Sequence, residues 1–190
     1  MKQVMFTDSF YYREFHTNKN LHKKIKQVLK KEKQRKVKVK NRSNIRGFQT
    51  LPMRQGELVE EVRAMIKPII AEELGFKDKK LAIANLWINE NTENCFNVPH
   101  VHPGSDFSGV YYVTAPKNSG DLFFLRNDVG LQMQDYGIKG LELKEETSNF
   151  YRVSPKKNVL LLFKSNLTHG VEANNSKKSR ISVSFNIWLE

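Results

Sequence analysis

The chain has 190 residues, of which 39% are apolar and 27% are charged, and its formal net charge is +12. This length fits one domain, and the apolar content is enough for a core, which argues against a fully disordered chain. No apolar run reaches the roughly 18–20 residues of a membrane span. There is no apolar stretch of a signal peptide at the N-terminus, and the single Cys95 excludes an internal disulfide framework. We therefore expect a cytoplasmic protein that does not contact a membrane.

The positive charge is concentrated at the N-terminus. Residues 1–48 contain 15 Lys and Arg but 3 acidic residues, whereas residues 49–190 contain 17 of each kind. A basic segment on a neutral body indicates either a solvated Lys-rich helix or a surface for an acidic partner such as nucleic acid. Aromatic residues are missing from residues 23–40, which favours the solvated helix. We predict a basic arm over residues 1–48, packed on or extending from a body over residues 49–190.

The first part of the chain is predicted to be mainly helical. A short strand is expected over residues 2–6 and a helix over residues 21–36, while residues 37–39 alternate Val and Lys as in a one-sided strand or an extended linker. The clearest helix covers about residues 55–74, because its apolar residues recur on one face. Pro68 should kink or break this helix.

After residue 75 the pattern changes to short apolar runs between turn signals, which is typical of strands. Many short strands predict a β-sandwich or barrel. The polar, irregular residues 126–157 are expected to be a long insertion between strands. The predicted strands cover residues 81–88, 109–113, 122–125, 159–163, 169–172 and 181–189.

Three of the five histidines form a candidate metal site. His100 and His102 are two residues apart, so in an extended segment both imidazoles project to the same side, about 7 Å apart along the chain. His169 follows a later apolar run, and a close pair with a distant third ligand is how a β-barrel assembles a three-ligand site. H-x-H pairs also occur as ordinary surface histidines. His16 and His22, in the basic segment, are expected at the surface.

A second candidate is Arg180, at the start of the last apolar run. A hairpin across residues 174–175 would return it beside His169, facing the same interior. A buried Arg is costly without an anionic partner, and its planar guanidinium can bind a carboxylate through two hydrogen bonds. Alternatively, the side chain reaches solvent at the end of the strand.

These residues, with the stretches around them, resemble the Fe(II)- and 2-oxoglutarate-dependent oxygenases, in particular a subfamily of short phage and bacterial proteins in the prolyl-hydroxylase-like branch. The resemblance runs from about residue 42 to the end. It implies a double-stranded β-helix, the cupin-like jelly roll, preceded by helices. It also implies a dioxygenase that converts O2 and 2-oxoglutarate to succinate and CO2 while it hydroxylates a substrate. A protein side chain is the first substrate that we expect. If the protein is phage-encoded, we expect it in the cytoplasm of a bacterial host. The matching stretches are residues 42–49, 97–105, 108–113, 119–124, 159–163, 169 and 180–186.

The resemblance implies the ligands of the iron. The family uses an H-x-D or H-x-E pair and a later His, the two-His, one-carboxylate triad. His100 and His169 match the two histidines, but His102 stands where the carboxylate is expected. We therefore expect either a three-His site or a two-His site in which His102 is displaced and Asp106 is the substitute to test.

The resemblance also implies how 2-oxoglutarate is bound. Arg180 matches the cation for its far carboxylate, and Tyr112 matches a family Tyr that donates to the same group. Ser182 shares a face with Arg180 and could add a hydrogen bond. Tyr111 should point to the opposite face and pack beneath the first helix. Five other aromatic residues are expected in the core rather than in contact with substrate: Trp87, Trp188, Phe123, Phe163 and Phe185.

Two other functions stay open at this stage. One is a non-catalytic, cupin-like module that holds a metal or a ligand, which His102 favours. The other is a protein that contacts nucleic acid through its basic arm. The pairing of Arg180 with Tyr112 favours the oxygenase, because a bare metal site needs no carboxylate clamp. The sequence has no P-loop, dinucleotide fingerprint or zinc-finger pattern.

Overall fold

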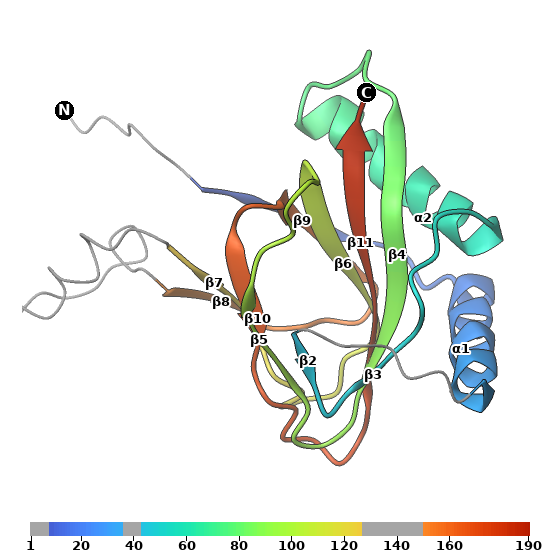
Figure 1. Ribbon diagram of the computed structural model, residues 1–190, viewed down its shortest axis with the longest axis vertical. Helices are drawn as coiled ribbons and strands as arrows, with labels where there is room; N and C mark the ends of the chain where they lie inside the picture. Colours follow the sequence, from blue (N-terminus) through green and yellow to red (C-terminus); the bar gives the residue numbers. More distant parts are fainter. Residues whose placement is uncertain (1–7, 36–42, 127–149) are drawn as a thin grey trace, which may run out of the picture.

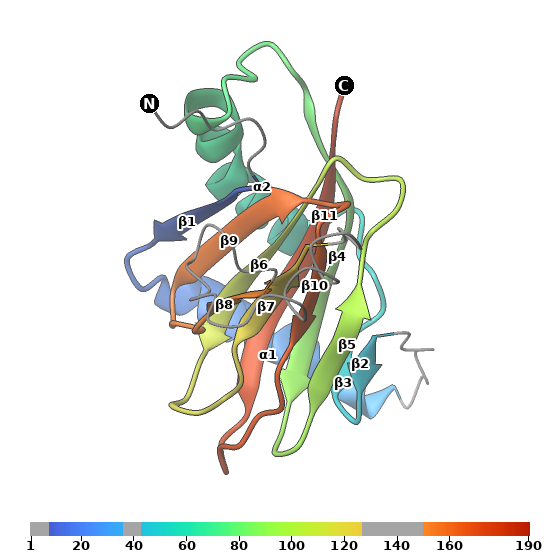
Figure 2. The same ribbon diagram turned by 90° about the vertical axis from the view of Figure 1, so that its left-hand side faces the viewer.

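The computed structural model describes residues 8–35, 43–126 and 150–190. Two antiparallel sheets face each other, and helices cover the outer side of one of them (Figure 1). The larger sheet has six strands in the order β1-β9-β6-β11-β4-β3, and the smaller has five in the order β2-β5-β10-β7-β8. Figure 2 views the molecule from the side of the five-stranded sheet. The predicted fold, a double-stranded β-helix with N-terminal helices, is confirmed.

The elements follow one another along the chain with two helices between the first and fourth strands. In order they are β1 (Phe10–Glu14), α1 (Lys19–Gln34), β2 (Asn44–Ile45), β3 (Phe48–Gln49), α2 (Glu57–Pro68), the π-helical turn η1 (Ile69–Glu73), β4 (Leu81–Asn91), β5 (Phe96–His100), β6 (Phe107–Thr114), β7 (Leu122–Leu125), β8 (Phe150–Val153), β9 (Val159–Lys164), β10 (Thr168–Val171) and β11 (Arg180–Leu189). No helix in these described ranges is long and apolar enough to cross a membrane.

Side chains alternate between the two faces of the six-stranded sheet, as the pleat of a strand requires. On β11, Ile181 and Val183 belong to the core beneath the helices, while Ser182 and Arg180 line a cavity between the sheets. On β9, Leu160 and Leu162 face the helices, and Leu161 and Phe163 face the other sheet. The sheet therefore separates a helix-covered core from the interior of the sandwich.

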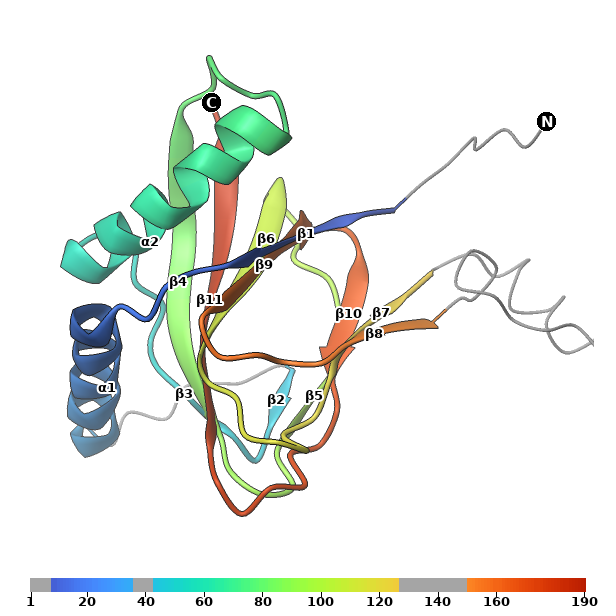
Figure 3. The same ribbon diagram turned by 180° about the vertical axis from the view of Figure 1, so that it is seen from behind.

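The helix α1 packs on the outer face of the six-stranded sheet, as the view from behind shows (Figure 3). It begins two residues before the predicted start because the Asn18 side chain accepts a hydrogen bond from the Leu21 N–H at 3.0 Å. Leu21, Ile25 and Leu29 are buried in the core beneath it. In addition, β1 pairs with β9 over five residues. The described part of the basic segment thus contributes to the sheet and its core, and the division at residue 48 stays a prediction.

Pro68 marks a change in helical pattern, not a break. Pro68 has no N–H to donate to the preceding turn, and the chain continues from it as the π-helical η1. The Leu74 N–H donates to the Ile69 carbonyl at 3.2 Å, five residues back. The prediction that Pro68 disturbs the helix over residues 55–74 is confirmed, and the wider turn is the form that the disturbance takes.

The six predicted strands after residue 75 all form, with small differences at their ends. The prediction of an irregular insertion over residues 126–157 is wrong for Phe150–Val153, which form β8 and pair with β7. The strand predicted over residues 2–6 and the extended segment over 37–39 lie outside the described residues.

The predicted hairpin across residues 174–175 is wrong. β10 pairs with β5 and β7, whereas β11 pairs with β4 and β6. Consecutive strands of a jelly roll cross from one sheet to the other, so His169 and Arg180 stand on opposite sheets. Both nevertheless line the same cavity, so the interior that they were expected to share exists.

His22 is buried, which corrects the prediction of a surface position. Its Nε2 forms a hydrogen bond with the Tyr111 hydroxyl at 2.9 Å. Tyr111 points toward α1, and its predicted place beneath the first helix is confirmed. Burial lowers the pKa of His22, and the nearby ammonium groups of Lys157 and Lys26 lower it further.

Replacing His22 should reduce the acid sensitivity of the fold. Because the folded chain holds His22 neutral, the unfolded chain takes up a proton more readily once the pH falls below about 6.5, and stability is lost through that window. When the pH is lowered from about 7.5 to 5, the free energy of unfolding in urea should fall less for His22→Gln than for the wild type. The control is His16→Gln, since His16 is exposed. Equal pH dependence in wild type and His22→Gln would contradict this assignment.

Candidate metal centre and carboxylate clamp

Three histidines, from β5, from the segment just after it and from the neighbouring β10, meet between the sheets. His100, at the end of β5, lies directly opposite His169 of β10 in the antiparallel register. His102 follows β5 by two residues. The ring centroids are 4.9 Å apart for His100 and His102, 4.5 Å for His100 and His169, and 5.1 Å for His102 and His169. One ligand atom from each ring lies within 4.8 Å of the others, so the three together could hold one metal ion.

Backbone carbonyls orient two of the three rings. The Nδ1 of His100 donates to the Val98 carbonyl at 2.8 Å, and the Nδ1 of His169 donates to the Leu167 carbonyl at 2.8 Å. A carbonyl only accepts, so in each neutral ring the proton is on Nδ1 and the Nε2 lone pair is free. This is the outer hydrogen bond that metal-bound histidines commonly make, and it fixes the tautomer that binds a metal.

Burial keeps the cluster neutral. It lowers the pKa of His169 to about 3 and that of His102 to about 4, with the His100 imidazole as a smaller contribution to both shifts. The pKa of His100 is also lowered by burial. Phe163 packs against His169 with ring centroids 4.6 Å apart. Three neutral imidazoles in a partly apolar setting are ready to bind a cation without first losing a proton.

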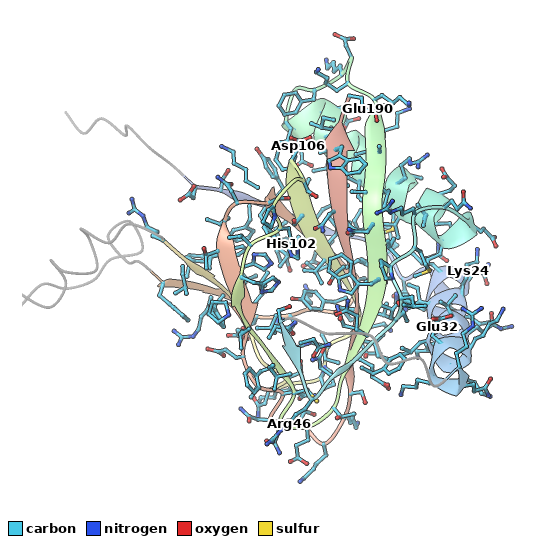
Figure 4. The ribbon with its side chains drawn as sticks, viewed as in Figure 1. Lys24, Glu32, Arg46, His102, Asp106 and Glu190 are labelled. Atoms are coloured by element: carbon cyan, nitrogen blue, oxygen red, sulfur yellow. The ribbon has the colours of Figure 1, made fainter. Side chains whose placement is uncertain are left out.

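Asp106 lies away from this cluster. Its Oδ2 accepts a hydrogen bond from the Leu189 N–H at 2.8 Å, at the far end of β11. Figure 4 shows Asp106 well separated from His102. Among the residues that the structure describes, the ligand group contains the three histidines and no carboxylate. The geometry thus favours the three-His arrangement over a substitution by Asp106.

Arg180 enters the same interior from the opposite sheet. Its side chain is 2% exposed, and its Nη1 donates to the Ser119 carbonyl and, at 2.9 Å, to the Gly120 carbonyl. Burial lowers the pKa of the guanidinium, but Arg remains charged in proteins. Nε and Nη2 donate to no residue in the described ranges. Two nitrogens of a buried cation are therefore free to bind an anion.

Tyr112 and Ser182 complete a polar end of the cavity. They lie opposite each other on β6 and β11, and neither hydroxyl hydrogen-bonds to another described residue. Burial raises the pKa of Tyr112 to about 12, partly offset by the charge of Arg180. Tyr112 is thus a neutral O–H donor beside a fixed positive charge, which is suited to a carboxylate.

One cavity of about 60 Å³ connects the two groups. It is lined by His100, His102 and His169 as well as by Tyr112, Arg180 and Ser182. All of the residues that the sequence proposed for the metal or for 2-oxoglutarate face this cavity except Asp106. The cavity lining comes from strands of both sheets, so the cavity lies between them.

A row of amides on the cavity wall was not predicted from the sequence. Asn89 and Asn91 of β4 face inward two residues apart, and Asn44 bridges them with hydrogen bonds of 3.4 Å to Asn89 and 3.1 Å to Asn91. The Asn89 amide also donates to the Ser184 hydroxyl at 3.0 Å. Polar residues at every second position of an otherwise apolar strand were the available signal.

Two tryptophans differ from the expected core positions. Trp87 lines the cavity, with its ring centroid 5.8 Å from that of His102. Trp188 is 42% exposed near the end of β11, because it lies on the opposite face of the strand from Ile187 and Leu189, which belong to the helix-covered side. Phe185 is fully buried as expected, and Phe163 is buried while also lining the cavity. Trp87 shares the face of Asn89, so strand alternation turns it inward.

The fold and the site together define a cupin-like jelly roll with a histidine cluster and a buried cation in one cavity. Residues 85–186, more than half of the chain, match the family described as "Putative 2OG-Fe(II) oxygenase". The chain belongs to this family. The predictions of a 2-oxoglutarate-dependent dioxygenase, with Fe(II) and 2-oxoglutarate as cofactors, are confirmed at the level of the family. No curated protein matches the sequence.

Solved structures of low sequence identity share the fold. A Trichoplax adhaerens prolyl hydroxylase in complex with a hypoxia inducible factor peptide fragment is 14% identical, with 96% of this chain and 84% of that chain covered and a TM-score of 0.63. A Pseudomonas putida prolyl-4-hydroxylase is 13% identical, with 96% of this chain and 93% of that chain covered and a TM-score of 0.60. HygX from Streptomyces hygroscopicus, solved with nickel and 2-oxoglutarate bound, is 11% identical, with 96% of this chain and 83% of that chain covered and a TM-score of 0.57.

Substitutions at positions 102 and 106 separate the two ligand arrangements. His102→Ala should weaken Fe(II) binding about tenfold or more because one of three ligands is lost. Asp106→Asn should leave the affinity unchanged, since the Asp106 carboxylate bonds to the end of β11. His102→Asp should retain metal binding, because it supplies the usual carboxylate. Anaerobic calorimetric titration measures all three, and a loss confined to Asp106→Asn would show that the three-His assignment is wrong.

Proposed function

We propose that this protein is an active dioxygenase in which His100, His102 and His169 hold Fe(II), and Arg180, Tyr112 and Ser182 hold the far carboxylate of 2-oxoglutarate. The observation that carries the proposal is the shared cavity, with a neutral histidine cluster on one sheet and a buried cation with free hydroxyls on the other. A metal-binding module alone has no use for the second group. The buried guanidinium is costly to maintain unless an anion completes it.

The chain's own side chains would then position the reactants. Fe(II) and 2-oxoglutarate, when bound, supply the oxidation of a substrate C–H bond by O2, with 2-oxoglutarate leaving as succinate and CO2. The carbonyls of Val98 and Leu167 hold the two opposed imidazoles with their Nε2 atoms free. The two carbonyls that bind Nη1 of Arg180 fix the direction of its remaining N–H groups. Phe163 excludes water beside His169.

A protein side chain is the proposed substrate. Several solved structures with this fold are prolyl hydroxylases, and one of them holds a peptide fragment. In this chain Trp87 stands beside His102 in the cavity wall, where an indole offers an apolar surface to a ring or an aliphatic side chain.

A cytoplasmic location is proposed because the single cysteine, Cys95, is a free and buried thiol. An acidic partner for residues 1–48 is also proposed.

The second candidate is a non-catalytic metal-binding or ligand-binding module. The specific observation in its favour is His102, which leaves the cluster without the usual carboxylate. The two functions differ in turnover. Mixed with Fe(II), O2, 2-oxoglutarate and a set of proline-containing and other peptides, the dioxygenase produces succinate and a hydroxylated peptide in equal amounts. A module binds both ligands and produces neither.

Arg180→Ala should weaken 2-oxoglutarate binding by roughly two to three orders of magnitude, because loss of one partner of a buried charge pair costs about 3–5 kcal/mol. Arg180→Lys should recover only part of this loss, since an ammonium cannot reproduce the planar guanidinium. Tyr112→Phe should cost less, about 1–3 kcal/mol. Fe(II) affinity, measured without 2-oxoglutarate, should change little in all three variants, because none of them removes a metal ligand.

The measurement is anaerobic titration of the Fe(II)-loaded protein with 2-oxoglutarate, followed by the weak visible charge-transfer band of the chelate. Arg152→Ala is the matched control, because it removes an exposed Arg that pairs with Glu172 on the surface at 2.7 Å. Unchanged 2-oxoglutarate affinity in a folded Arg180→Ala variant would place the clamp elsewhere and favour the module.

A further inference from the structure

A second hollow, of about 480 Å³, lies on the outer side of the six-stranded sheet. It is bounded by α1, by the end of β6 with the turn after it, and by the turns that precede β9 and β11. His22 and Val113 line it, and both belong to the helix-covered side of the sheet. It shares no lining residue with the cavity of the metal centre. It is therefore a separate feature of the surface.

Lysines dominate this hollow. Five line it, and no lining residue is acidic: Lys26, Lys117, Lys157, Lys177 and Lys178. Lys177 pairs with both carboxylate oxygens of Glu93, at 2.7 and 3.0 Å. The other four form no ion pair with any residue in the described part of the chain. Lys26 and Lys157 lie close enough to His22 to lower its pKa, after the larger effect of burial. Four cations that pair with no described carboxylate repel one another around this hollow, and a bound anion would relieve that repulsion.

The basic surface continues along α1. Lys19, Lys23 and Lys30 are exposed and form a row with Lys26 at steps of three or four residues, which places all four lysines on one side of the helix. Neighbours on such a row are about 5–6 Å apart, and the row is roughly 16 Å long at the helical rise per residue. A single small anion would occupy the hollow alone. An extended row of evenly spaced charges matches a polymer of evenly spaced anions.

We propose that this basic face, formed by the α1 lysines and the hollow, binds the phosphate backbone of a nucleic acid duplex. Phosphate contacts by Lys position a protein on a duplex without reading its sequence. Single strands are bound mainly by stacking of bases on aromatic side chains, and no Phe, Tyr or Trp lines the hollow. The duplex is a docking partner and not a substrate, because the sheet separates this face from the cavity. The proposal does not depend on the function proposed for that cavity.

The face differs from a basic arm acting alone, because the body supplies Lys117, Lys157 and Lys178. These three lysines are exposed and form no ion pair within the described ranges, so their removal should not disturb the fold. The test variant is the triple substitution Lys117→Ala, Lys157→Ala and Lys178→Ala. The control is Lys77→Ala, Lys79→Ala and Lys164→Ala, which removes the same charge from exposed positions at the opposite end of the sheet.

The experiment measures the fluorescence anisotropy of labelled DNA and RNA duplexes of about 20 base pairs, with full-length protein and salt from roughly 50 to 200 mM. The test variant should bind at least one of the duplexes about tenfold or more weakly than the wild type, and its plot of log affinity against log salt should be shallower by about 2.7. The control should stay within about threefold of the wild type. Fe(II) and 2-oxoglutarate affinities should not change in either variant.

Three results would overturn the proposal. One is the absence of duplex binding by the wild type at the lowest salt. Another is an equal loss in the test and control variants, which would mean that net charge alone attracts the duplex. The third concerns competition between a poly-glutamate chain and an unlabelled duplex of equal charge. If poly-glutamate displaces the labelled duplex at a lower concentration than the unlabelled duplex does, an acidic protein is the better partner.

Discussion

The opposite chemistry of the two faces of the six-stranded sheet is the constraint on which the rest of the structure depends. Its outer face is apolar and must be covered, so α1 and α2 pack there. Its inner face carries Arg180, Ser182 and the amides of β4, and the five-stranded sheet covers it and encloses a polar cavity. The adjacent residues Tyr111 and Tyr112 show this contrast. Tyr111 forms a hydrogen bond with His22 under α1, and Tyr112 faces the cavity.

A polar interior of this kind is stable only if its groups find partners. The amides of Asn44, Asn89 and Asn91 satisfy one another within the wall, and two carbonyls hold one nitrogen of Arg180. Within the part of the chain that the structure describes, the Tyr112 and Ser182 hydroxyls and the other nitrogens of Arg180 form no hydrogen bond, and these groups belong to residues that line the cavity. They are therefore the polar groups of the wall that a ligand can still satisfy.

Strand alternation explains why much of this was predictable from the sequence. The runs that became β7 and β9 are nearly continuous apolar segments between turn signals, and His100 with His102 could be paired because residues two apart share a face. β5 was missed because Phe96–His100 contains Pro99 and lacks an apolar run. The hairpin was wrong because a turn signal at residues 174–175 does not say whether the chain stays in its sheet.

Long-range contacts account for the errors at single residues. His22 looked like a surface residue because its neighbours are lysines, yet α1 places it over Tyr111, 89 positions further along the chain. Trp87 looked like core because it lies in the apolar run of β4, yet its neighbour across space is His102. In both cases the side-chain type was ambiguous, and the packing of a distant element decided its environment.

The replacement of a carboxylate by His102 changes the charge balance of the proposed site. With three neutral imidazoles, a bound Fe(II) would keep its full charge of two, and Arg180 adds another positive charge to the same cavity. 2-Oxoglutarate carries two negative charges, one carboxylate toward each of these cations. Its binding would therefore offset a larger repulsion here than in a site that already contains a carboxylate ligand. Since such coupling is reciprocal, metal and 2-oxoglutarate should strengthen each other's binding, and His102 makes the metal site depend on its co-substrate.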